Sequence, residues 1–318
     1  MRTFRLVLVL CSLVYSAAGT ADSPGDVAGV VKVLDLAFGG ISEMSGMVRS
    51  RRFDDIYWMH NDSGDTARLF AVNSEGRVQF PGYLADQYHG ETMTPGTSPW
   101  PGLTVLGASN VDWEDIAIDE DNLYIADLGN NGNARRDLGV YVLPEPNPRQ
   151  IAQARALKFV PVRYPSQASY PAEQWHYDSE AMFIYRGKLY FLTKHRQPGK
   201  ISEWEAGTRL YRLDSMATDR VNVLRQVDMH DEVAVVTAAD LSPDGRRLAV
   251  LCYTALWIFE APRSRDRWLS GKARMTPLDL RVTGQAEAVA WRDDRTLLIG
   301  NEGSELFLVT ADEVPYRN

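Results

Sequence analysis

Short apolar runs separated by turn-forming residues dominate this sequence. The runs are rich in β-branched and aromatic residues and are bounded by Gly, Asn, Asp and Pro, as in LYIADLGNNG at 123–132. Apolar residues spaced three and four positions apart, which would indicate helices, are scarce. Runs of this kind are typical of β-strands. The pattern therefore predicts an all-β protein made of many short strands.

The runs form five repeats, and each repeat opens with an acidic residue at the start of an apolar strand. Two more strands follow each opening, and fourth strands are visible at 157–164, 221–229 and 275–280 and weakly at 104–106. Self-similarity over tens of residues indicates a repeat architecture, and repeated antiparallel sheets are typical of a β-propeller. The openings are SEMSG at 42–46, WEDIA at 113–117, SEAMF at 179–183, ADLSP at 239–243 and AEAVA at 286–290.

The two ends of the chain complement each other. The fifth repeat ends at Thr310 with almost no chain left for a fourth strand, whereas the apolar segment 30–36 belongs to no repeat. Pairing this N-terminal strand with the fifth repeat would close the ring and cover an exposed sheet edge. We therefore expect one domain over residues 22–318, a β-propeller of five four-stranded blades. Six blades would require a repeat that the sequence does not show.

The first residues have the pattern of a secretory signal peptide over 1–21, with a basic start, a short apolar run and then small residues. The run from Leu6 to Val14 is about half of the roughly 20 residues that a membrane span needs, so we expect none. Cleavage would leave 32 basic against 42 acidic side chains, and this balance argues against nucleic acid as a partner. Only Cys252 would remain, without a disulfide partner. We expect a periplasmic or secreted protein.

The acidic openings predict a site with carboxylates. In an antiparallel blade the first strand begins at the edge where the second strand ends, so all the openings should meet at one face of the ring, here called the mouth. The polar segments 60–64, 127–132, 193–196, 253–254 and 300–302 follow the second strands and should surround it. The acidic residues expected there are Glu43, Glu114, Glu180, Asp240 and Glu287.

Five carboxylates at close range repel one another unless some are protonated or a cation lies among them. Oxygen ligands favour a hard cation, and a wide, flexible ring favours calcium over magnesium. We therefore predict a calcium site formed by these five residues. The alternative is that the acidic residues cap backbone N–H groups at the strand starts and join the blades.

Three basic residues near the mouth are candidates for chemistry. His60, Lys194 and His195 could bind or polarise a phosphate or carboxylate group, although such residues are more often solvated surface residues. The sequence has no G-x-S-x-G elbow, no P-loop, no H-E-x-x-H and no dinucleotide-binding glycine pattern. Catalysis at this mouth would therefore depend on a metal rather than on an activated nucleophile.

Several short motifs resemble those of secreted bacterial β-propeller proteins of uncertain function. They are SGM at 45–47, NDSG at 61–64, DWEDIA at 112–117 and DLGNN at 127–131. More distantly, the arrangement is similar to that of five-bladed calcium-activated nucleotidases and of calcium-dependent propeller phytases. That resemblance implies a calcium ion among acidic strand residues in the central tunnel. It supports the fold more than any activity, because propellers serve many functions.

Two functions fit these expectations. The first is a calcium-dependent hydrolase, in which the metal would bind a small anionic phosphoester and His60, Lys194 and His195 would orient it. Hydrolysis of a lactone or sugar ester at the same metal would need the same residues. The second is a non-catalytic binding propeller with structural calcium, in which long loops at 83–101 and 161–174 would contact a protein partner. In either case we expect a monomer.

Overall fold

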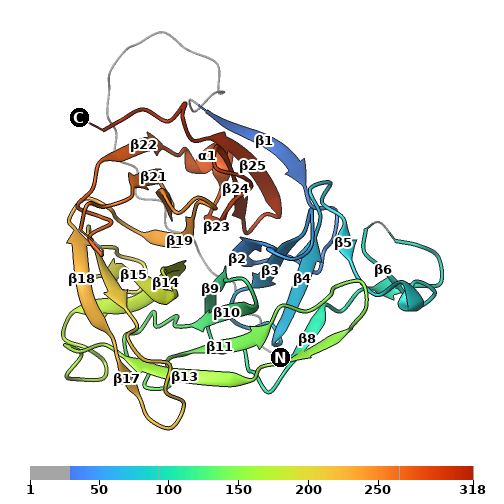
Figure 1. The fold of residues 1–318 in the computed structure, drawn as a ribbon, viewed down its shortest axis with the longest axis horizontal. Helices are drawn as coiled ribbons and strands as arrows, with labels where there is room; N and C mark the ends of the chain where they lie inside the picture. The colour runs from blue at the N-terminus through green and yellow to red at the C-terminus, as the bar shows by residue number, and fades with distance from the viewer. Residues whose placement is uncertain (1–28, 92, 265, 318) are drawn as a thin grey trace.

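The computed structural model describes residues 29–91, 93–264 and 266–317 and shows five antiparallel sheets arranged in a ring (Figure 1). Each sheet is one blade, with its first strand nearest the central axis and its fourth strand near the rim. The predicted fold, a propeller of five blades with four strands each, is confirmed. The described residues contain no sixth blade.

The strands follow the chain around the ring. Blade 1 contains β2 (Met44–Arg49), β3 (Tyr57–Asn61), β4 (Arg68–Val72) and β8 (Leu103–Leu106). Blade 2 contains β9 (Trp113–Ile118), β10 (Asn122–Asp127), β11 (Gly139–Pro144) and β13 (Lys158–Arg163). Blade 3 contains β14 (Trp175–Tyr185), β15 (Lys188–Arg196), β16 (Thr208–Arg212) and β18 (Arg225–His230). Blade 4 contains β19 (Val236–Leu241), β20 (Arg247–Cys252), β21 (Ala255–Glu260) and β22 (Ala273–Pro277).

Blade 5 is completed by a strand from the N-terminal side of the chain. It contains β23 (Ala286–Trp291), β24 (Thr296–Asn301), β25 (Glu305–Thr310) and β1 (Val30–Asp35). β1 runs antiparallel to β25, with Val30 opposite Val309. In Figure 1 the blue strand lies beside the red ones, and the predicted ring closure is confirmed. The signal peptide falls at 1–21, outside the described residues, so export and the domain start at 22 remain predictions.

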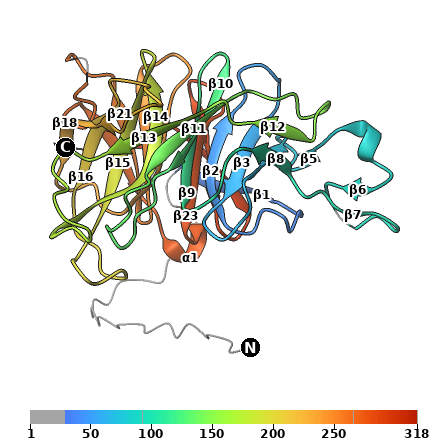
Figure 2. The same ribbon diagram turned by 90° about the horizontal axis from the view of Figure 1, so that it is seen from below.

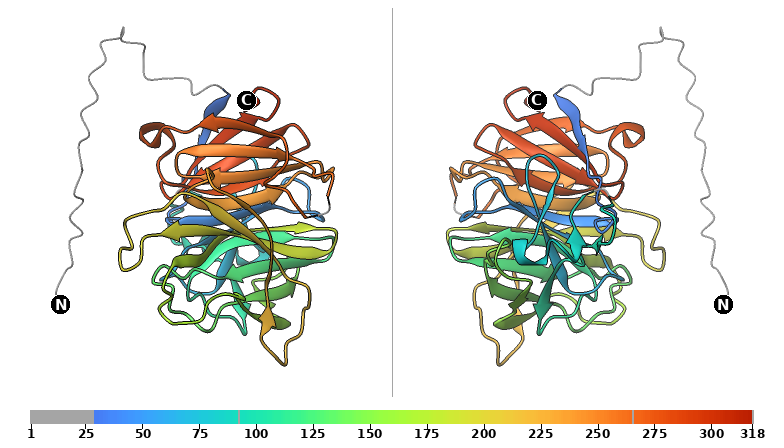
Figure 3. Two further views of the ribbon diagram at one scale, coloured as in Figure 1. Left: turned by 90° about the vertical axis from the view of Figure 1, so that its left-hand side faces the viewer. Right: turned by 90° about the vertical axis from the view of Figure 1, so that its right-hand side faces the viewer.

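The core lies between the blades rather than at one centre. Apolar side chains on both faces of the inner strands pack against the neighbouring blades, and five buried clusters fill the five interfaces. Figure 3 shows neighbouring sheets stacked face to face. Between blades 1 and 2, for example, the fully buried Trp58 and Trp113 belong to one cluster. Burial on two faces explains why the inner strands are almost continuously apolar in sequence.

A latch that was not predicted joins successive blades at the rim. The chain that follows the third strand of one blade lies against the outer strand of the preceding blade. β12 (Gln153–Arg155) thus runs parallel to β8, and β17 (Asn222–Val223) runs parallel to β13. Tyr316, which follows blade 5, forms a bridge to Arg274 in blade 4. These short strands cover outer edges that would otherwise expose unpaired backbone groups.

Asp115 of β9 connects three blades near the axis. Its Oδ2 accepts hydrogen bonds from the backbone N–H of Met182 in blade 3 (2.7 Å) and of Ala239 in blade 4 (3.2 Å). Its Oδ1 accepts one from the N–H of Ile116 (2.8 Å). Burial raises the pKa of this carboxyl well above its usual value, although the three backbone donors oppose the shift. Asp115 therefore satisfies backbone groups of inner strands that have no strand neighbour.

One extension leaves the ring. The segment that follows β5 (Val78–Gln79) contains a short 3-10 helix (Gly82–Leu84) and the strand pair β6 (Tyr88–His89) and β7 (Ser98–Pro99), and it projects from blade 1 (Figures 1 and 2). Its small core contains Phe80 stacked on Trp100 at 5.3 Å between ring centroids. The α-helix α1 (Leu280–Thr283) is a single turn, and none of the described helices could cross a bilayer.

Candidate metal centre

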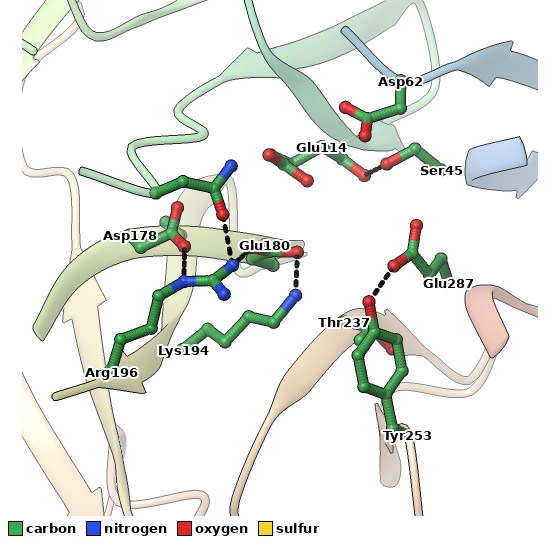
Figure 4. Close-up of polar contacts among 12 residues, drawn as sticks. Ser45, Asp62, Glu114, Asp178, Glu180, Lys194, Arg196, Thr237, Tyr253 and Glu287 are labelled. Atoms are coloured by element: carbon green, nitrogen blue, oxygen red, sulfur yellow. Dashed lines mark hydrogen bonds and ion pairs between the residues drawn. The ribbon is translucent and has the colours of Figure 1, made fainter. Parts of the chain in front are cut away.

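The first strand of every blade has a β-bulge at the same place near the mouth. In each case the pairing with the second strand skips one residue, which leaves that residue outside the ladder and increases the local twist. Figure 4 shows the five side chains around one space. They are Ser45, Glu114, Glu180, Thr237 and Glu287.

The structure therefore corrects the predicted ring of five equivalent acidic residues. Glu114, Glu180 and Glu287 occupy the bulge position, but Glu43 lies two residues before Ser45 and is exposed. Asp240 lies three residues after Thr237, towards the other end of β19. Only the register of the pairing distinguishes these positions, because Ser45 and Thr237 carry no charge that marks them in the sequence.

Asp240 lies at the end of β19 that is farther from the mouth. Its carboxylate accepts hydrogen bonds from the N–H groups of Trp291 and Leu241, each at 2.8 Å. With Arg49 and Arg51 it lines a cavity of about 160 Å³ on that side. Burial raises the pKa of Asp240 to about 7. Its role in the structure is to hold blade 4 against blade 5, as the capping alternative expects of such residues.

Three further aspartates join the bulge glutamates at the mouth. Oxygen atoms of Asp62, Asp112 and Glu114, here called the first acidic group, all lie within 4.8 Å of one another. The same holds for Glu114, Asp178 and Glu180, the second acidic group. Glu114 belongs to both. These carboxylates could hold a metal ion.

The carboxylate of Glu114 has no protein partner among the described residues. The side chain is only 4% exposed, and no hydrogen bond or ion pair reaches it from the part of the chain that the structure describes. Burial raises its pKa well above the usual value, and the charges of Glu180 and Asp62 raise it further. The pKa of Asp112 is raised to about 7, first by burial and then by Asp62 and Asp178. Among the described residues no lysine or arginine forms an ion pair with the first acidic group, although the charge of Arg135 lowers the pKa of Asp112 and that of Lys194 lowers the pKa of Asp62.

The loop after β10 passes close over this group. A Cβ atom at Gly129 would overlap Oε1 of Glu114 and the carboxyl of Asp112, so any larger residue would displace these side chains or the loop. The N–H of Gly129 donates to the carbonyl of Asp112 (3.1 Å), which holds the loop against the acidic residues. The DLGNN motif thus shapes one wall of the candidate site.

The second acidic group, in contrast, already has protein cations. Nζ of Lys194 lies 2.9 Å from Oε2 of Glu180, and Nε of Arg196 lies 3.2 Å from Oδ2 of Asp178. Arg196 also approaches Oε1 of Glu180 at 3.4 Å. The pKa of Asp178 is nevertheless raised to about 7 by burial and by Glu180. A metal ion is therefore needed less here than at the first acidic group.

Glu287 closes the other side of the mouth. It accepts a hydrogen bond from the hydroxyl of Tyr253, whose ring lies 4.8 Å from Nζ of Lys194. Burial raises the pKa of Glu287 to about 8, against the opposing charge of Lys194. At neutral pH this carboxyl is therefore largely protonated and can donate a proton.

Of the three predicted basic residues, the structure brings only Lys194 to the acidic residues. His195 is its neighbour on β15 and projects to the opposite face, where it stacks on His176 at 3.9 Å between centroids. His60 is fully buried against Trp113, and its Nδ1 lies 3.0 Å from the carbonyl of Asn61. Burial lowers the pKa of His60 to about 4 and that of His195 to about 3. Neither histidine forms a hydrogen bond or ion pair with the two acidic groups.

Sequence reasoning placed Asp62, Arg196 and Tyr253 only in the polar segments around the mouth, without a role, and did not assign Asp112 or Asp178 at all. A signal for two of them was present, because Asp112 and Asp178 each precede a bulge glutamate by two residues, in the pattern D-x-E. Residues two apart on a strand share a face. Glu43 stands at the corresponding position, two residues before Ser45, and is exposed.

Comparisons with known proteins extend to the fold only. No family model matches the sequence, and no curated protein matches it. Among solved structures, the chain is similar to a luciferin-regenerating enzyme (TM-score 0.45, 9% identity, 92% of this chain and 79% of that chain). It is also similar to the Malassezia sympodialis allergen Mala s 1 (0.49, 11%, 89% and 95%) and to glutaminyl cyclase of Myxococcus xanthus (0.44, 11%, 91% and 97%). At these levels of similarity the functions of those proteins give no guide to the mouth of this one.

Proposed function

We propose that the mouth of this propeller binds one divalent cation, calcium, through Asp62, Asp112 and Glu114. The observation that carries the proposal is Glu114, a residue only 4% exposed, whose carboxylate lies within 4.8 Å of two other acidic residues and accepts no hydrogen bond among the described residues. Buried charges in proteins are normally paired or coordinate a metal. An all-oxygen donor set suits a hard cation.

The choice of calcium follows from the shape of the group. Asp62 and Asp112 are only partly buried and lie in loops beside the inner strands, so the donors can adjust and leave positions open. Calcium accepts six to eight oxygen ligands in flexible geometry, whereas magnesium demands a near-octahedral set. Cation binding would also favour the ionised carboxylates and release protons.

The proposed activity at this centre is hydrolysis of a small anionic phosphoester. A bound divalent cation would act as a Lewis acid on the phosphate oxygens and so make phosphorus more electrophilic. Lys194 lies beside the acidic groups as a second positive charge, paired with Glu180 at 2.9 Å. Water would attack phosphorus as the P–O ester bond breaks, and the proton that it loses would pass to an ionised carboxylate of the mouth. Glu287, with a pKa of about 8, would donate the proton that the leaving alcohol takes up.

The second candidate is a non-catalytic binding propeller, for which the contacts of Arg196 are the specific support. Its guanidinium joins Asp178 and Glu180 in blade 3 to Asn131 in the loop that follows the second strand of blade 2. The N–H of Asn130 donates to Oδ1 of Asp178 (2.6 Å). Such a network joins blades, and a cation beside it would add to the stability of the ring without turnover.

A cation titration separates these proposals. We expect calcium to raise the melting temperature of chelator-treated protein far more than magnesium does, because ligand binding to the folded state alone stabilises it. Glu114→Gln should abolish the rise, whereas Glu43→Gln, which removes an exposed acidic residue nearby, should preserve it. Calcium-dependent hydrolysis of p-nitrophenyl phosphate that Glu114→Gln abolishes would support the hydrolase.

The other outcomes are equally informative. A calcium-dependent rise without hydrolysis of any phosphoester or lactone tested would favour the binding propeller. No rise with either ion, in protein verified to be metal-free, would overturn the proposed cation site.

A further inference from the structure

Trp204 differs from every other tryptophan of the chain in its exposure. It is 45% exposed, whereas the other seven are at most 9% exposed. Burial of an indole ring is strongly favourable, so an ordered tryptophan that remains open to solvent is informative. Isolated exposed apolar residues are common, and the surroundings of Trp204 decide what its exposure means.

The loop that carries Trp204 is ordered by its own contacts. It connects β15 to β16, and the backbone of Trp204 forms a bridge with that of Arg196. The N–H of Glu205 donates to the carbonyl of His195 (3.0 Å), and Nη1 of Arg196 donates to the carbonyl of Ile201 (2.6 Å). These contacts fix the backbone of the loop that carries the indole. The loop therefore loses little conformational entropy when a ligand binds to Trp204.

The same loop is tied to the acidic mouth. Arg196 forms a backbone β-bridge with Trp204, and its guanidinium pairs with Asp178. The indole ring meets the ring of Tyr253 edge to face, with 6.0 Å between centroids and 88° between planes. Tyr253 in turn donates its hydroxyl to Glu287. The rings of Tyr253 and Trp204 thus connect Glu287 at the mouth to the exposed face of the indole.

We propose that Trp204 is a binding platform for the organic part of the ligand, and that this part is a flat ring, aromatic or sugar. The inference rests on the proposed anion-binding role of the mouth. An anionic group held at the acidic centre would place the rest of the molecule beside Tyr253 and Trp204, where a ring face packs on the indole. The ligand class is then a phosphate ester of a ring-bearing alcohol rather than of a short open chain.

Phosphonates, which phosphoester hydrolysis cannot cleave, test the platform. The probes are phenylphosphonate, which has an aromatic ring, and methylphosphonate, which has none, each titrated calorimetrically in the presence of calcium. Glucose 1-phosphate is the sugar probe, compared with glycerol phosphate. We expect Trp204→Ala to weaken phenylphosphonate binding at least tenfold, Trp204→Phe to retain most of it, and methylphosphonate binding to be unchanged.

Two controls isolate the indole. Ile201→Ala alters an equally exposed side chain on the same loop, and Tyr83→Ala alters an exposed aromatic residue on the blade 1 extension; neither should change phenylphosphonate affinity. Acrylamide quenching gives a second readout, because Trp204 is the exposed indole among the described residues. Phenylphosphonate should protect it from quenching and methylphosphonate should not. If Trp204→Ala weakens the binding of only one of the two ring-bearing probes, glucose 1-phosphate or phenylphosphonate, that probe identifies the kind of ring that the platform accepts.

This experiment distinguishes failure of the Trp204 platform from failure of the proposed cation site. Calcium-dependent methylphosphonate binding, combined with equal phenylphosphonate affinity in wild type and Trp204→Ala, would overturn the platform and leave the cation site standing. Phenylphosphonate binding that depends on Trp204 but not on calcium would support the platform and count against the cation site. Failure of both phosphonates and both sugar-series probes to bind would overturn the platform as well.

Discussion

Nζ of Lys194 lies 2.9 Å from Oε2 of Glu180, and both side chains are almost completely buried beside the axis of the propeller. Although burial opposes it, the charges of Glu180 and Glu287 raise the pKa of Lys194 above its usual value. The ammonium group therefore stays charged and serves as a fixed cation for one half of the mouth. Around Glu114, in the other half, none of the described lysines or arginines forms an ion pair with the acidic residues.

Removing Lys194 should be costly. We expect Lys194→Met to destabilise the protein by about 3–5 kcal/mol, because it leaves the buried Glu180 with only the longer contact to Arg196 at 3.4 Å. Lys188→Met is the matched control, since Lys188 forms an exposed pair with Asp214 at 2.8 Å, and exposed pairs contribute about 0–1 kcal/mol. Urea unfolding of both variants measures the difference. Equal losses in the two variants would show that the buried pair has no special role.

Asp115 should be a stability residue rather than a site residue. Asp115→Ala leaves the N–H groups of Met182 and Ala239 without their acceptor near the axis, and we expect a loss of about 2–5 kcal/mol. Asp115→Asn retains one acceptor oxygen and should lose less. The exposed Asp121→Ala should change little. Thermal melts rank the three variants, and an unchanged midpoint in Asp115→Ala would contradict this role.

The fold was largely predictable because its signals are local. Apolar runs, turn residues and the unmatched segment 30–36 each carry their information within a few positions, and the closing strand β1 follows from simple counting of strands per repeat. The rim latch was not predictable in the same way. β12 and β17 are two or three residues long, and what makes them strands is the neighbouring blade rather than their own sequence.

The site was only partly predictable because it depends on register. In WEDIA the two adjacent acidic residues face different directions: Glu114 points into the mouth and Asp115 crosses to blades 3 and 4. A bulge moves residues between faces, and sequence alone does not locate it. The same uncertainty put Asp240 in the ring in place of Thr237. For His195, the alternation of side chains along β15 decides that it faces away from Lys194.

The calcium-free protein should lose stability as the pH rises from about 4 to about 8. Asp112 and Asp178 have folded-state pKa values of about 7 and Glu287 of about 8, whereas unfolded carboxyl groups titrate near 4. The folded state therefore binds more protons in this window, so its stability is greatest below pH 4 with respect to these groups and falls as the pH increases. Each group contributes a slope of at most about 1.4 kcal/mol per pH unit.

Calcium should reduce this pH dependence, because the cation would favour the ionised carboxylates that burial disfavours. Urea unfolding at several pH values, with calcium and with chelator, measures both slopes. Asp112→Asn should flatten the slope of the calcium-free protein. Because His60 and His195 have lowered pKa values and oppose this trend at lower pH, the decisive range is above about pH 7. Stability of the chelated protein that increases with pH in that range would contradict the raised pKa values of the carboxyl groups.

Gly129 offers the sharpest test of the geometry of the first acidic group. A Cβ atom at this position would overlap the carboxylates of Glu114 and Asp112, so Gly129→Ala must displace them or move the loop. We expect calcium affinity to fall at least tenfold, because ligand positions must hold to within a few tenths of an ångström. Gly132→Ala is the matched control in the same loop, since a Cβ there would meet nothing within 4 Å. Calorimetric titration with calcium compares the two variants, and unchanged affinity in Gly129→Ala would mean that the cation binds away from Glu114 and Asp112.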